Sequence, residues 1–162
     1  MSDLYRAAIA GGLLGTVVMT TMLRAASELG ITRMDLPFLL GTAVTGNRRR
    51  ARIYGHLAHF ALGLLFAFGY AFVFDATGRA GWRIGLAIGA VHASFVATTL
   101  VNVILPIVHP RIGTPETGAG EVALLEAPGF MMLNYGRSTF FVTLLGHMAY
   151  GAIVGWACAN MT

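Results

Sequence analysis

Histidines are the side chains of this sequence best suited to bind a metal ion or to move a proton near neutral pH. His56 and His59 are three residues apart, so in a helix they share one side. His92 and His147 also lie inside long apolar runs, and His109 lies at the end of one. An imidazole in an apolar environment needs a hydrogen-bond partner or a ligand. The apolar runs must therefore place these histidines against polar groups.

The composition indicates an integral membrane protein. Of 162 residues, 56% are hydrophobic and 11% are charged, whereas soluble domains carry about 25% charged residues. A membrane-spanning helix needs about 20 apolar residues, and four runs satisfy this length. We expect one all-α domain over residues 1–162, a four-transmembrane-helix bundle with spans at residues 7–26, 53–74, 84–108 and 139–160.

Two apolar segments in the connecting loops are too short to span a bilayer. Residues 34–41 lie in loop one and residues 127–133 lie in loop three. Asp35 precedes Pro37, a spacing typical of a helix N-cap followed by proline in the first turn. We therefore expect short interfacial segments in loops one and three.

The basic residues are all arginines, and they indicate how the bundle is oriented. Eight of them flank loops one and three: Arg24, Arg33, Arg48, Arg49, Arg50, Arg52, Arg111 and Arg137. Three flank the opposite side: Arg6, Arg79 and Arg83. Arginine-rich loops favour the cytoplasmic side and its anionic lipids. We expect a multi-pass protein of a bacterial inner membrane, with both termini on the non-cytoplasmic side and with no nucleic-acid partner.

Helix geometry brings several polar residues to one half of the membrane. With a rise of about 1.5 Å per residue, His59 and Asn102 lie roughly 9 Å from the arginine-rich side, and His147 lies roughly 12 Å from it. The same estimate places His92 roughly 24 Å away, where it would be a hydrogen-bonded core residue. The candidate metal ligands are the polar and thioether side chains of the shared half: His56, His59, His147, Met19, Met22 and Asn102.

His59 and His147 are the strongest candidates for binding a cofactor. Imidazole binds copper, zinc and iron and can be an axial haem ligand, and the thioethers of Met19 and Met22 favour copper or haem. Haem b or copper is therefore the cofactor that this pair would hold. The alternative is structural, because Thr20 and Thr143 offer hydroxyl groups to which these histidines could bond.

The sequence contains no nucleophile elbow, phosphate-binding loop or His-Glu-x-x-His motif. Asp35, His109 and Glu126 are candidates for a polar site at the membrane interface, with His56 nearby. Such groups could act as general acids and bases. We expect a non-catalytic protein, with an interfacial enzyme as an alternative.

Three stretches of the sequence, at residues 34–42, 105–111 and 128–136, resemble those of small bacterial four-helix inner-membrane proteins. The resemblance covers most of the chain and implies the four-helix fold. These proteins have no assigned activity, so the resemblance implies no functional residue.

Three hypotheses for the function follow. The first is a membrane component, an accessory subunit or interaction protein, with a histidine-lined intramembrane site; its partners would be the lipid bilayer and a larger membrane complex or a second copy of the chain. The second is a small redox or metal-handling protein that binds haem or copper. The third is the interfacial enzyme.

Overall fold

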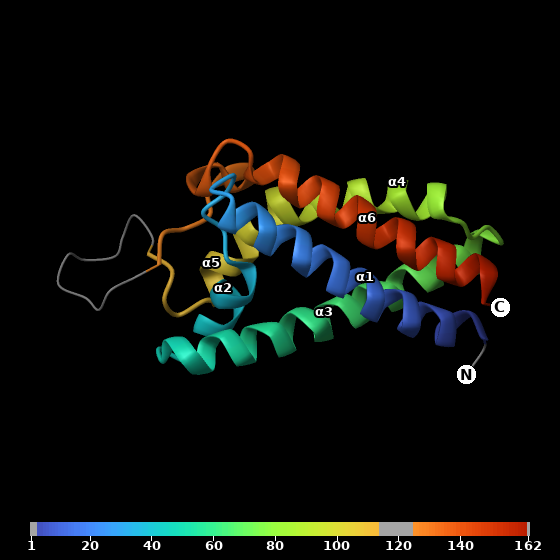
Figure 1. Ribbon diagram of the computed structural model, residues 1–162, viewed down its shortest axis with the longest axis horizontal. Helices are drawn as coiled ribbons and strands as arrows, with labels where there is room; N and C mark the ends of the chain where they lie inside the picture. The colour runs from blue at the N-terminus through green and yellow to red at the C-terminus, as the bar shows by residue number, and fades with distance from the viewer. Residues whose placement is uncertain (1–2, 114–124, 162) are drawn as a thin grey trace.

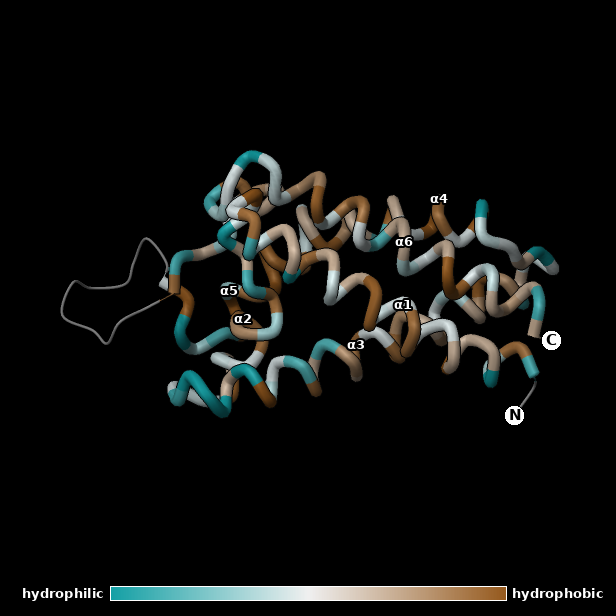
Figure 2. Tube along the Cα trace, in the orientation of Figure 1, coloured by the Kyte–Doolittle hydropathy of each residue, from teal (hydrophilic) through white to brown (hydrophobic). Residues whose placement is uncertain are grey.

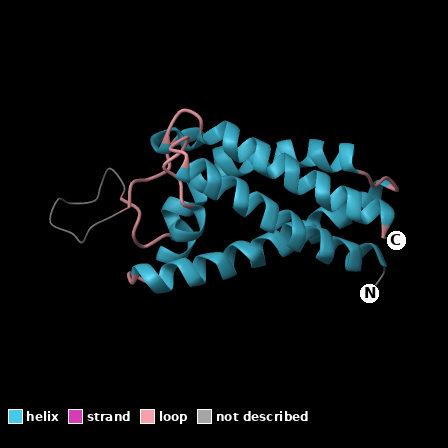
Figure 3. Ribbon diagram, viewed as in Figure 1, coloured by secondary structure: helices cyan, strands magenta, loops and turns pink. Residues whose placement is uncertain are grey.

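A computed structural model describes residues 3–113 and 125–161. Within these residues the chain is helical, with no extended strand (Figure 3). Residues 114–124 of the predicted third loop lie outside the described part. The helices, drawn in Figure 1, are α1 (Asp3–Glu28), α2 (Leu36–Thr42), α3 (Arg48–Thr77), α4 (Trp82–Phe95), the π-helix η1 (Val96–Ile104), α5 (Leu105–Val108), the 3₁₀-helix η2 (Phe130–Tyr135) and α6 (Thr139–Asn160).

Four helices are long and apolar enough to cross a membrane, which confirms the predicted all-α four-helix bundle. They are Asp3–Glu28, Arg48–Thr77, Trp82–Val108 and Thr139–Asn160. The first two extend past the predicted apolar runs at both ends, because charged residues at helix ends can stay helical in the headgroup region. Figure 2 shows the hydrophilic residues concentrated near the helix ends and connections. The two termini lie at the same end of the bundle (Figure 1).

The short helix predicted in loop one is present. The Asp35 carboxylate accepts a hydrogen bond from the Phe38 backbone N–H at 3.0 Å, and Pro37 lies in the first turn. Helix α3 begins with an equivalent cap, because the Asn47 side chain accepts from the Arg50 N–H. It ends at Gly78, whose φ of 63° is readily adopted only by glycine. These caps fix both ends of the helix that carries His59.

Helix α6 packs against both α1 and α4, and α1 packs in turn against α3. The spans therefore form the order α4, α6, α1, α3. The contact between α4 and α6 is very close: a Cβ atom added to Gly85 would lie 2.0 Å from the carbonyl oxygen of Gly151. Glycine in both helices permits this backbone approach. The short helix α2 packs on α3, at the end where Figure 1 shows α3 diverging from α6.

The third span is not a uniform α-helix. After α4 the chain continues as nine π-helical residues, Val96–Ile104, and then as α5. Long π-helices are rare, and short π-helical segments often occur at functional sites. Here η1 follows His92 by four residues, and its residues Val96, Leu100 and Val101 form one wall of the cavity described next.

Candidate functional site: a histidine-lined cavity

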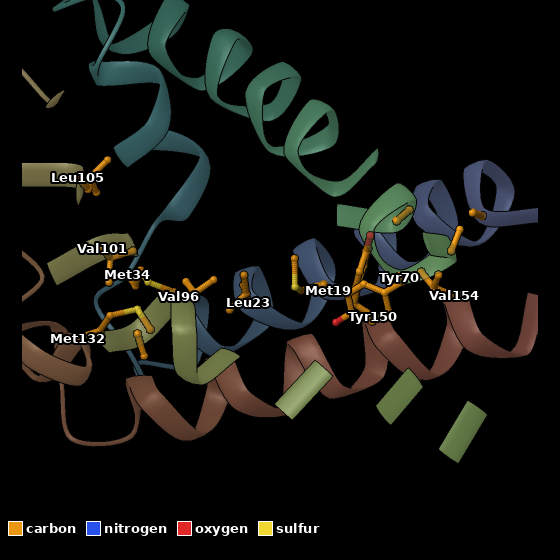
Figure 4. Packing of buried hydrophobic residues seen from close by; sticks show 14 of the residues in the cluster. Met19, Leu23, Met34, Tyr70, Val96, Val101, Leu105, Met132, Tyr150 and Val154 are labelled. Atoms are coloured by element: carbon orange, nitrogen blue, oxygen red, sulfur yellow. The ribbon is translucent and has the colours of Figure 1, made fainter. Parts of the chain in front are cut away.

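A cavity of about 70 Å³ lies inside the bundle, between α1, α3, α6 and the third span. His59, His92 and His147 line it, together with Thr143 and Tyr150. The rest of its wall is apolar and includes three methionines, Met19, Met34 and Met132. Figure 4 shows Met19 beside Tyr150, and Met34 and Met132 at the end nearer α5. The cavity thus combines imidazole and thioether groups in a hydrophobic setting.

The hydrogen bonds of His59 determine which of its nitrogens is unprotonated. Its Nδ1 lies 3.2 Å from the Thr20 hydroxyl oxygen, which itself lies 2.6 Å from the Thr16 carbonyl oxygen. The Thr20 hydroxyl has a single proton and donates it to that carbonyl, so its oxygen accepts from Nδ1–H. The lone pair of His59 is therefore on Nε2. This atom is buried and has no hydrogen-bond partner among the described residues.

His147 has the same tautomer as His59. Its Nδ1 donates to the Thr143 carbonyl oxygen at 2.8 Å, which leaves a lone pair on Nε2. Both imidazoles are strongly buried, with 4% of His59 and 5% of His147 exposed. A ring N–H bonded to an oxygen is the arrangement that usually fixes the tautomer of metal-binding histidines.

His92 supplies a donor in place of an acceptor. The Tyr70 hydroxyl lies 3.3 Å from Nδ1 and makes no other hydrogen bond within the described part of the chain. We assign the donor role to the Tyr70 hydroxyl, because its proton has no other acceptor there; in this tautomer the His92 proton is on Nε2. This Nε2 is also buried and has no partner in that part. The His92 ring contacts Phe66 and His147, at centroid distances of 3.9 and 4.7 Å.

The position of His92 corrects the depth estimate made from the sequence. Gly89 lies against His147, since a Cβ on Gly89 would be 2.3 Å from the His147 carbonyl oxygen. The antiparallel pairing of α4 with α6 thus places His92 at the level of His147. The estimate failed because the third span continues past the start of α6 and packs against η2. His92 therefore belongs to the same cavity as His59 and His147.

The other predicted ligands have different positions. Met19 lines the cavity, but Met22 and Asn102 do not. His56 is exposed, and its Nδ1 donates to the Arg52 carbonyl oxygen at 2.7 Å. Sequence reasoning missed Met34 and Met132, because both lie in loop segments that have no helical periodicity to place them. Met132 moreover has a positive φ of 58°, which no sequence pattern indicates.

The size and donor set of the cavity limit what it can hold. Sites for drug-sized ligands measure about 300–1,000 Å³, so a cavity of about 70 Å³ leaves no room for a haem between His59 and His147 in this conformation. No group of three histidine, cysteine or acidic side chains among residues 3–113 and 125–161 is arranged to hold a metal ion. The cavity suits a small ligand such as an ion, a diatomic molecule or a few waters.

Two of the predicted interfacial residues flank a common depression, but His109 lies elsewhere. Asp35 lines one pocket of about 340 Å³ with His56 and another of about 230 Å³ with Glu126. The Glu126 carboxylate pairs with Arg33 at 3.1 Å. Burial, followed by the Glu126 charge, raises the pKa of Tyr135 in the second pocket to about 12. The Tyr135 hydroxyl thus stays protonated and donates to the Glu126 carbonyl oxygen.

His109 attaches α2 to the third span. Its Nε2 lies 3.0 Å from the Leu39 carbonyl oxygen and 3.3 Å from the Thr42 hydroxyl. Its Nδ1 accepts from the Arg111 backbone N–H at 3.2 Å. Both ring nitrogens are therefore used within the protein, and only 3% of the residue is exposed. These bonds give His109 a structural role that His59 does not share.

Comparison with known proteins identifies no relative. No protein-family model, no curated protein and no solved structure matches the chain. The fold and the composition define the class of the protein, which is a multi-pass membrane protein with four spanning helices. The function must be inferred from the site itself.

Proposed function

We propose that this chain is a non-catalytic membrane component, an accessory subunit or interaction protein, whose histidine-lined cavity binds a small ligand. The observation that carries the proposal is the pair of buried Nε2 atoms, on His59 and His92, that have no partner in the described protein. An unsatisfied buried polar group costs about 1–3 kcal/mol. A ligand that donates to His59 and accepts from His92 removes this cost.

Substitution of His59 and of His109 by leucine tests whether His59 serves a ligand, whereas His109 serves the fold. We expect His59→Leu to leave the free energy of unfolding of the ligand-free protein unchanged or to raise it by about 1 kcal/mol, because it removes an unpaired buried nitrogen. His109→Leu is expected to lower that free energy by about 2 kcal/mol, since both of its nitrogens are bonded. Reversible unfolding in mixed micelles measures both. Equal losses in the two variants would show that His59 serves the fold.

Copper handling is a second candidate, and the donor chemistry favours it. Neutral imidazoles with thioethers, and no thiolate or carboxylate in the lining, suit Cu(I) better than zinc or calcium. His59 and His147 each present an Nε2 lone pair, and Met19, Met34 and Met132 lie in the same wall. The absence of a group of three histidine, cysteine or acidic side chains among the described residues, noted above, does not bear on such a site. A copper ion here would be bound by two histidines and a methionine thioether, and methionine does not belong to those residue types.

Metal analysis of protein purified from its native membrane tests this candidate. We expect about one equivalent of copper per chain, retained after exposure to a zinc chelator, and a loss of most of it in His147→Leu. His56→Leu is the matched control, because His56 lies outside the cavity. A wild-type preparation that holds no copper and takes up no Ag(I), the stable mimic of Cu(I), would eliminate copper handling and leave the broader ligand proposal standing.

The surface of the bundle suits a membrane location and a protein partner. The exposed apolar residues of α3 and α6, such as Leu57, Leu65 and Phe141, suit a lipid bilayer and leave room for a neighbouring protein. We infer an inner membrane of bacterial type, shared with the small four-helix proteins that the sequence resembles, with loops one and three in the cytoplasm. Purification in a mild detergent tests the subunit role. A single monodisperse monomer with no co-purifying protein would contradict it.

A further inference from the structure

We propose a second binding site, for the headgroup of a phosphatidylethanolamine molecule, in the pocket between α1, α2 and α3 at the arginine-rich end. This interfacial pocket, of about 340 Å³, is lined by residues that include Arg24, Ser27, Glu28, Asp35 and His56. It is separate from the histidine-lined cavity, and the proposal does not depend on what that cavity binds. Its volume falls in the range of about 300–1,000 Å³ that ligand sites occupy.

The pocket lies at the depth of a lipid headgroup. Arg24 is the first charged residue after the apolar part of α1, and Arg52 is the last before the apolar part of α3. These two residues mark the membrane boundary on their helices. His56 lies one turn farther along α3, at the top of the hydrocarbon region. The pocket therefore faces the headgroup layer and not the aqueous phase alone.

A shallow groove on α3 continues the pocket toward the hydrocarbon. Arg52, Ile53, His56, Leu57 and Phe60 line this α3 groove, and His56 belongs to both hollows. Ile53 and Leu57 are 56% and 64% exposed. A diacyl lipid whose headgroup fills the pocket can lay a chain along these apolar side chains. This continuity distinguishes a lipid from a small soluble zwitterion.

The charges of the two hollows match a zwitterion and not an anion. They contain two guanidinium groups, of Arg24 and Arg52, and two carboxylates, of Glu28 and Asp35. Arg24 pairs with Glu28 at 2.6 Å, whereas Asp35 and Arg52 form no salt bridge within residues 3–113 and 125–161. The Asp35 carboxylate also caps α2 by accepting from the Phe38 N–H. An ammonium group suits Asp35, and a phosphate suits Arg52.

The ends of α1 and α3 favour the same polarity, whereas the N-terminus of α2 at Asp35 has the opposite sign. Ser27 and Glu28 belong to the last turn of α1, where backbone carbonyls make the environment negative, whereas Arg52 lies in the second turn of α3, near its positive end. A primary ammonium can also donate hydrogen bonds to the Asp35 carboxylate and the Ser27 hydroxyl. A choline headgroup has no N–H to donate. The site should therefore discriminate between these two zwitterions.

Lipid retention measured by native mass spectrometry tests the proposal. The protein is presented with equal amounts of phosphatidylethanolamine, phosphatidylcholine and phosphatidylglycerol with identical acyl chains. We expect the first to be retained at least about tenfold over the others, as the loss of one charge-assisted hydrogen bond implies. Equal retention of the three lipids, or displacement of bound lipid by an equal concentration of free phosphoethanolamine, would overturn the proposal.

One substitution removes the proposed ammonium ligand without removing a helix cap. Asp35→Asn keeps a side-chain oxygen that can cap α2, since asparagine caps as well as aspartate, but it lacks the negative charge. We expect this variant to lose the preference for ethanolamine over choline while its helix content is unchanged. Asp75→Asn, an exposed carboxylate at the other end of α3, is the matched control and should keep the preference. An unchanged preference in Asp35→Asn would refute the assigned role of Asp35.

Discussion

Gly85→Ala is expected to lower the free energy of unfolding of the bundle by about 3 kcal/mol, at the upper end of the usual cost of overpacking. The new Cβ would lie 2.0 Å from the Gly151 carbonyl oxygen and 3.1 Å from the Gly155 Cα. Both neighbours are backbone atoms of α6, so no side chain can rotate away. The two helices must separate, and the dispersion contacts along α4 and α6 are lost with them.

Gly69→Ala is the control for this prediction. Gly69 also lies within a spanning helix, but a Cβ there would meet nothing within 4 Å. Its unfolding free energy should remain within about 0.5 kcal/mol of the wild type. Unfolding in mixed micelles, followed by circular dichroism, measures the two variants together. If Gly85→Ala were as stable as Gly69→Ala, the close contact of α4 with α6 could not be correct.

Gly55→Ala is expected to have a large but local effect. A Cβ on Gly55 would lie 1.5 Å from the Pro37 carbonyl oxygen, so α2 could not keep its position on α3. The four spans do not depend on this contact, because α6 packs against α1 and α4 without α2. We therefore expect α2 to detach while the bundle stays folded.

Hydrogen exchange distinguishes this local change from global unfolding. Amides of residues 38–42 should exchange roughly a hundredfold faster in Gly55→Ala, which corresponds to about 2.7 kcal/mol, while those of α6 are unchanged. Gly69→Ala, on the same helix, should leave both regions as they are. Faster exchange throughout α6 would instead show that α2 is required for the whole fold. Since Leu36 and Leu40 line the cavity, detachment of α2 also opens the histidine site.

Hydropathy and capping rules were sufficient to predict the four spans and the short helix α2. The four spans follow from uninterrupted apolar runs, which have few alternatives in a bilayer. The helix at Leu36–Thr42 follows from Asp35 and Pro37, two residues with strong positional preferences. His59 and His147 were predicted to lie in the same half of the membrane and to face the bundle interior. Both line the cavity. The prediction was possible because helical periodicity fixes the face on which a residue lies.

The offset between helices could not be predicted in this way. Periodicity gives the face of a residue but not its level relative to a neighbouring helix, which depends on how the backbones interlock. The close contact of Gly89 with the His147 backbone fixes the position of α4 along the axis of α6. This contact brings His92 into the cavity, whereas the depth estimate from the sequence had placed His92 too far from His147. Met34 and Met132 depend on loop conformations, and a π-helix such as η1 has no distinguishing sequence pattern.

The central position of α6 has a consequence for the biogenesis of the protein. Among the four spans, α6 is the last to be synthesised, yet it supplies the surface on which α1 and α4 pack. Until residues 139–160 enter the membrane, Gly11 and Gly15 of α1 and Gly85 of α4 have lipid in place of a partner helix. The assembled bundle, and with it the cavity wall that carries His147, can form only after translation of the fourth span.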